Sequence, residues 1–200
     1  RLGALQRWAQ FRERWLAPRA PAGYRPGVTL GHLLRNLGPL EILQAQAGTA
    51  QLHCPQQRWH AEVHECVEAH LLMHVVTCEF RLEVPALQQG EVQMKLRHTG
   101  ALRRTGLACV YSGGDKALFA RVRDRLAADA ALMAALMPLD FKRLTLSCRR
   151  GQWHLALEHM GASEVVNRMP ALRRYIPISA QQRGHLLASL TSFNQILVHL

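Results

Sequence analysis

Apolar and polar side chains alternate along residues 59–84, with the period of a β-strand that has one buried face. Trp59 and Ala61 begin the apolar row, and His60 begins the polar row. Glu65 is the one interruption of the apolar row. The alternation is too long for one ordinary strand, so we expect a bend or hairpin near residues 68–71.

Further strands are predicted downstream of this region. Val92–Arg97 and Thr105–Ser112 read as two strands joined by a short loop. The clearest hairpin covers residues 142–158, where Arg150-Gly151 separates two alternating runs and supplies the turn. Gly161 is expected to end the second strand of this hairpin.

Helical spacing of apolar residues predicts the remaining elements. Thr29 is expected to cap a helix over 30–37, and Ser179 with Gln182 forms a capping box for the last helix. Asp115 should cap a helix that restarts at Asp129. The other predicted helices cover residues 2–16 and, closed by Pro170, residues 163–169.

The order of these elements favours an α+β fold, in which an antiparallel sheet has helices packed mainly on one face, with helices at both chain ends. A parallel sheet would need strands and helices to alternate throughout, and this chain lacks that order. Its 200 residues suit one domain. We therefore expect a single α+β domain over 1–200, with helix 2–16 and the Pro- and Gly-rich connector 17–28 as an appendage.

The charge is strongly positive. The chain has 25 Lys and Arg against 14 Asp and Glu, a net charge of +11, and only Lys95, Lys116 and Lys142 are lysines. Such a balance attracts polyanions and anionic lipids, although an Arg-rich chain also fits a GC-rich genome. No apolar run reaches the length of a spanning helix, and no signal peptide is visible.

Five cysteines, an odd number without a CxxC pair, argue against a disulfide framework. Reduced thiols indicate a cytoplasmic protein.

Histidines and a thiol gather in the first alternating region. His60, His64 and Cys66 share one face if the segment is a strand, and these are zinc-ligand types. They are weak metal candidates, because the catalytic HExxH pattern is absent and the wet face of a half-buried strand would look the same. We expect no metal and no other cofactor.

Basic pairs stand next to strand ends or turns. Arg103, Arg104, Arg173 and Arg174 are the candidate ligand-binding residues, and they would form a surface for polyanions if they converge. The alternative is that turns simply carry solvated side chains. The segment 2–16 could touch a membrane surface through its Trp and Arg residues, but docking on the protein's own sheet is favoured.

Three segments resemble uncharacterised proteobacterial domains of unknown function: Arg103–Leu107, the strand around Trp153, and Leu172–Pro177. The resemblance covers the C-terminal half, contains no catalytic motif and implies no activity. We expect a non-enzymatic cytoplasmic binding domain for a partner protein or an acidic ligand. The alternatives are a nucleic-acid-binding protein that uses its Arg-rich surface and a metal-dependent enzyme that uses the His60, His64 and Cys66 cluster.

Overall fold

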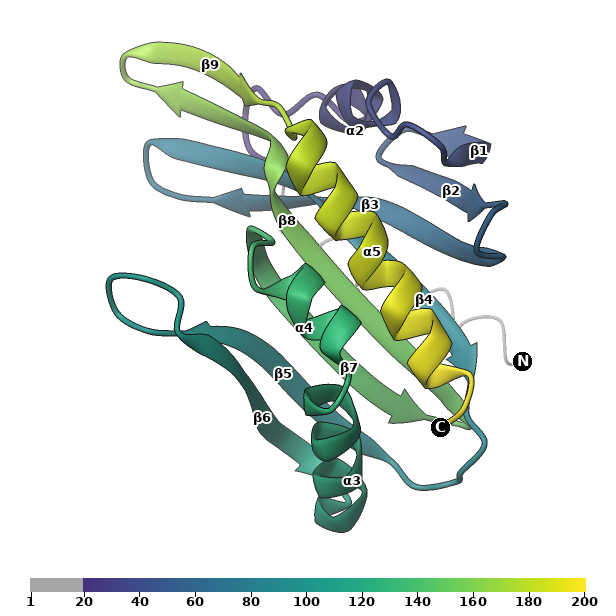
Figure 1. The fold of residues 1–200 in the computed structure, drawn as a ribbon. Coiled ribbons are helices and arrows are strands. Elements are labelled where there is room, and N and C mark those ends of the chain that lie inside the picture. Colours follow the sequence, from purple (N-terminus) through teal and green to yellow (C-terminus); the bar gives the residue numbers. More distant parts are fainter. Residues whose placement is uncertain (1–19) are drawn as a thin grey trace, which may run out of the picture.

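The computed structural model describes residues 20–200, in which one antiparallel sheet is covered by helices on one of its faces (Figure 1). This arrangement confirms the predicted α+β class. The helix expected over 2–16 lies outside the described residues.

Nine strands and four helices make up the described part of the chain. The strands are β1 (Glu41–Gln46), β2 (Thr49–Cys54), β3 (Trp59–Ala69), β4 (Met73–Pro85), β5 (Val92–Thr99), β6 (Gly106–Gly114), β7 (Phe141–Arg149), β8 (Gln152–Arg168) and β9 (Ala171–Ile176). The helices are α2 (Val28–Leu34), α3 (Lys116–Ala127), α4 (Ala130–Leu136) and α5 (Ala180–Leu197).

The strands follow the order β1-β2-β3-β4-β8-β7-β5-β6, and β9 pairs with β8. The central strand β8 has 17 residues and pairs with β4 along most of its length. Its first half also pairs with β7 and its second half with β9. This shared strand therefore joins the two parts of the sheet.

The hydrophobic core lies between the sheet and the helices. Trp59, Phe80 and Trp153 point from the sheet into this core and are fully buried. Helix α5 crosses the sheet (Figure 1) and contributes the fully buried Phe193. Burial of each such side chain stabilises the fold by about 1.5–3 kcal/mol. The Ser179 side chain accepts a hydrogen bond from the Gln182 backbone N–H, which confirms the predicted start of this helix.

The predicted hairpin over 142–158 is confirmed by the pairing of β7 with β8. Both turn residues, Arg150 and Gly151, have positive φ, at 52° and 73°. Two-residue hairpin turns of this kind match the twist of the flanking strands. The bend expected near residues 68–71 is the connection from β3 to β4.

The helix predicted over 163–169 and the strand end predicted at Gly161 are wrong. Strand β8 continues to Arg168, with a register irregularity opposite Val76 and Cys78 and a positive φ at Ala162. Gly161 therefore lies within the strand. Pairing with β4 on one side and β9 on the other outweighs the local turn signals of Gly161 and Pro170.

Helix α2 begins two residues earlier than predicted and ends three residues earlier, at Leu34. Its N-cap is Gly27, with a φ of 82°, rather than Thr29. Thr29 lies inside the helix, and its hydroxyl donates to Glu164 of β8 at 2.9 Å. Correct placement of this cap needs the sheet contact, which local sequence does not reveal.

Three strands, β1, β2 and β9, are not among the predicted elements, although β2 does alternate, with Ala50, Leu52 and Cys54 buried. All six residues of β1 are exposed, so the strand has no contrast between a buried and a wet face. β9 is likewise largely exposed. Such edge strands are defined by their pairing partners rather than by their own pattern.

Candidate functional site

The face of the sheet opposite the helices carries polar side chains from one border to the other. Cross-strand pairing aligns the side chains of this face in rows. One row, across β3, β4, β8, β7, β5 and β6, consists of Glu62, Arg81, Ala156, Thr145, Lys95 and Val110. We call this surface the open face. As the strand alternative predicts, His60, His64 and Cys66 share it.

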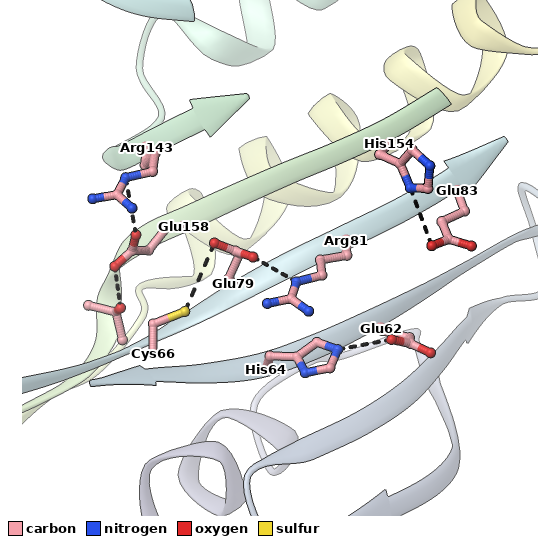
Figure 2. A network of polar contacts seen from close by, with 10 residues as sticks. Glu62, His64, Cys66, Glu79, Arg81, Glu83, Arg143, His154 and Glu158 are labelled. Carbon is pink, nitrogen blue, oxygen red and sulfur yellow. Dashed lines mark hydrogen bonds and ion pairs between the residues drawn. The ribbon is translucent and has the colours of Figure 1, made fainter. Parts of the chain in front are cut away.

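Over β3, β4 and β8 the charges of the open face pair with one another (Figure 2). Glu79 accepts from Arg81 Nε at 2.7 Å, and His64 Nε2 lies 2.9 Å from Glu62. His154 Nδ1 lies 3.3 Å from a Glu83 oxygen. The carboxylates in this part of the face are therefore already engaged.

Glu158 is the most buried carboxylate of this network. It accepts from the Thr77 hydroxyl at 2.5 Å. Arg143 Nε lies 4.0 Å and Lys142 Nζ 3.8 Å from its oxygens. Lys142 also bonds to Glu68 of β3. These contacts connect the acidic part of the open face to β7.

The proposed metal candidates point to the same face but use separate partners. His60 stacks on His53 with ring centroids 4.4 Å apart, whereas His64 pairs with Glu62. Burial, and then the Glu79 charge, raise the pKa of Cys66 to about 11, so its thiol is protonated at neutral pH. Within residues 20–200, no group of three or more His, Cys, Asp or Glu is placed to hold a metal ion.

A second part of the open face is basic. A hollow of about 320 Å³ over β5, β6 and β7 is lined by Lys95, Leu96, Arg97, Val110, Lys142, Arg143 and Leu144. We call it the basic hollow. Lys95 and Arg97 are exposed, and neither forms an ion pair with another described residue. The scarcity of lysine is a sequence signal for this site, since Lys95 and Lys142 are two of only three lysines.

The candidate Arg pairs fall in two different hairpins. Arg103 is exposed in the β5–β6 loop, and Arg104 bonds to Asp140 at 2.5 Å and to the Met137 carbonyl at 3.0 Å. Arg173 of β9 bonds to Glu164 and to the Gly23 carbonyl. Arg174 is exposed. One member of each pair is thus engaged in internal contacts.

A family model described as a protein of unknown function, DUF3156, matches residues 35–197. The chain belongs to the DUF3156 family. No curated protein and no solved structure is significantly similar to it. The DUF3156 match includes all nine strands of the described residues, and therefore both the acidic network and the basic hollow. Among the described residues of this DUF3156 protein, no helix is long and apolar enough to cross a membrane.

Proposed function

We propose that this DUF3156 protein is a non-enzymatic binding domain that holds an acidic ligand in the basic hollow. The observation that carries the proposal is the exposure of Lys95 and Arg97 side by side on one strand, without an ion-pair partner in the described chain. Ammonium and guanidinium groups in this position recognise carboxylate or phosphate oxygens.

The electrostatics of the hollow favour an anion. Lys95 and Arg97 stand two residues apart on one face of β5, about 7 Å from each other, and like charges at that separation repel one another. Glu68 and Glu158 compensate Lys142 and Arg143 from the acidic side of the face. Within residues 20–200, Lys95 and Arg97 have no such compensating carboxylate, so an acidic ligand would relieve their repulsion.

A second hollow of the open face is less suited to this role than the basic hollow. It measures about 280 Å³ over β1–β4, and Glu62 and Glu83 line it together with Arg81. Its only guanidinium already bonds to Glu79. An acidic ligand would meet carboxylates there, so the basic hollow is the better candidate.

The chemistry of the lining supports binding rather than catalysis. The basic hollow is lined by cations and aliphatic residues, with no carboxylate, imidazole or thiol among its lining side chains. It also lacks an aromatic ring on which a nucleic-acid base could stack. We therefore prefer an acidic ligand to a nucleic acid. All five cysteines are free thiols, which supports a role in the reducing cytoplasm.

A charge-reversal experiment tests this proposal. The probe is a fluorescein-labelled hexaglutamate peptide, titrated with protein at about 50 mM and about 150 mM NaCl. We expect Lys95→Glu with Arg97→Glu to weaken binding by about tenfold or more. The matched control is Arg149→Glu with Arg174→Glu, which changes the net charge equally at two exposed positions outside the hollow. The control variant should weaken peptide binding by less than about threefold.

Equal losses in the two double variants would contradict the proposal, because net charge alone would then explain the binding. A labelled DNA 12-mer provides the second comparison. Tight, sequence-dependent DNA binding near 150 mM NaCl would favour the nucleic-acid alternative instead.

A further inference from the structure

Strand β6 ends the sheet, next to the basic hollow. It pairs with β5 on one side, and no other described strand pairs with its outer side. Figure 1 shows it along the border of the sheet, with α3 beside its C-terminal end. The backbone N–H and C=O groups on that outer side are therefore available to pair with an added strand.

The edge lacks two features that normally prevent such pairing, charged residues and proline, and its register irregularity lies near the C-terminal end, opposite Gln93 and Met94. Residues 106–114 contain no charged residue and no proline, in a chain where 20% of residues are charged. Edge strand β1 carries Glu41, and β9 carries Arg173 and Arg174. Charges and prolines are the usual protection of sheet edges against another chain, so β6 is the least protected of these strands.

The open-face side chains of β6 are small. Ala108 is paired with Arg97, and Val110 is paired with Lys95. A strand added outside β6 would have its open-face side chains beside Ala108 and Val110. Glutamate is long enough to reach over these small residues to Lys95 and Arg97. The two cations are two residues apart, which equals the repeat of side chains on one face of a strand.

The opposite side of β6 is apolar. Leu107 and Cys109 are half-buried there, and the Tyr111 ring packs edge-on against Phe119 of α3 at 5.5 Å. The Tyr111 hydroxyl already donates to the Gly114 carbonyl at 2.6 Å, so strand addition belongs to the residues before Gly114. Alternate residues of an added strand would find apolar neighbours on this side.

We infer that β6 binds an extended peptide segment of a partner protein in which acidic and apolar residues alternate. This inference rests on the proposed function and specifies its ligand. Main-chain hydrogen bonds to β6 supply part of the affinity, and side chains at alternate positions supply the specificity. The acidic side chains contact Lys95 and Arg97, and the apolar ones contact Leu107 and Cys109.

Charge separates this partner from two other occupants. A second copy paired through β6 would bring two sets of Lys95 and Arg97 together in a molecule of net charge +11. The chain's own residues 1–19 have the wrong sign, with five arginines and one glutamate. A second copy or residues 1–19 would add positive charge next to Lys95 and Arg97. An acidic strand would instead neutralise these two side chains.

The test compares three labelled heptapeptides by fluorescence anisotropy at about 50 mM NaCl. The first has the sequence Gly-Glu-Val-Glu-Val-Glu-Gly. The second is the same peptide with both valine nitrogens methylated, which keeps the charge and removes strand hydrogen bonds. The third replaces glutamate by lysine. We expect the first to bind at least about tenfold more tightly than the second, and the third not to bind.

Hydrogen exchange locates the binding on the protein. The first peptide should slow amide exchange within residues 106–114, and Lys95→Glu with Arg97→Glu should abolish that protection. If the methylated peptide binds equally well and the double variant weakens both peptides, the anion-binding function stands and strand addition is wrong. If the double variant weakens neither, both proposals fail. If amide protection within residues 106–114 increases with protein concentration in the absence of peptide, the edge binds a second copy of the chain instead.

Discussion

His159 shows how one buried side chain makes the fold sensitive to pH. It is 2% exposed and lies on the helix-covered side of β8. Its Nδ1 accepts from the Gly161 N–H at 2.8 Å, so the proton of the neutral ring is on Nε2 and is donated to Gln182 Oε1 at 2.9 Å. Burial lowers the pKa of His159, despite the opposing effect of these hydrogen bonds. A second proton would place two donors, Nδ1–H and the Gly161 N–H, against each other.

We therefore expect the free energy of unfolding to decrease as the pH is lowered from about 7.5 to about 5.5. Because the folded-state pKa is lowered, the unfolded chain binds the proton first as the pH falls. The contribution of His159 is at most about 1.4 kcal/mol one pH unit below its ordinary pKa. Urea unfolding across this range measures it.

The His159→Gln variant is the control, since its amide can keep both hydrogen bonds without titrating. It should lose less stability over the same pH range than the unmodified protein. Some dependence should remain, because burial also lowers the pKa of His74. Parallel pH profiles for the two proteins would contradict this assignment.

At the scale of elements, two carboxylates hold helix α2 against the sheet. Glu65 accepts from the N–H groups of Gly27 and Leu30, at 3.2 and 2.9 Å, and from the Tyr24 hydroxyl at 2.6 Å. These helix N-terminal donors have no partner within the helix, so a residue from β3 satisfies them. Glu164 of β8 accepts a hydrogen bond from the Thr29 hydroxyl. Burial acts to raise the pKa of Glu164, but hydrogen bonds from Arg173 and Thr29 outweigh it and lower the value.

Glu65→Ala should reduce the free energy of unfolding by about 1–2 kcal/mol, because it leaves these donors without an acceptor. Glu62→Ala, three residues earlier on the open face, is the matched control and should cost less than about 0.5 kcal/mol. Urea denaturation of both variants measures the difference. Similar losses would show that Glu65 does not anchor the helix.

Glu65 also shows what the sequence can and cannot predict. Its position as a break in an apolar row is readable from the alternation, but its role needs α2, which lies more than 30 residues away along the chain. The same limit applies to the site. Alternation places His60, His64 and Cys66 on one face, whereas only the strand order reveals that Glu79 and Glu158 are their neighbours. Lys95 and Arg97 are missed for the same reason.

At the scale of the whole molecule, positive charge extends well beyond the basic hollow. Arg121, Arg149 and Arg174 are exposed on α3, β7 and β9. The hollow and the general surface should therefore respond differently to ligands of different length. A short acidic peptide can occupy only one site, but a long polyanion can contact many.

Heparin chromatography tests this distinction. We expect Lys95→Glu with Arg97→Glu and Arg149→Glu with Arg174→Glu to lower the eluting salt concentration by similar amounts. Both remove the same number of positive charges, and long-range attraction depends on counterion release. The hexaglutamate probe should separate the same two variants. A heparin elution changed only by the hollow variant would contradict the view that the whole surface takes part.

The central position of β8 has a consequence for how the chain folds as it is synthesised. The long inner edge of β4 finds its partner only when β8 leaves the ribosome, since Val84 pairs with Trp153 and His74 with Val166. At ordinary synthesis rates this delay is on the order of ten seconds. Through that interval the nascent N-terminal half exposes an apolar sheet and an unpaired strand. The two halves are therefore obliged to fold late and together, and a chaperone that shields β4 would act in that interval.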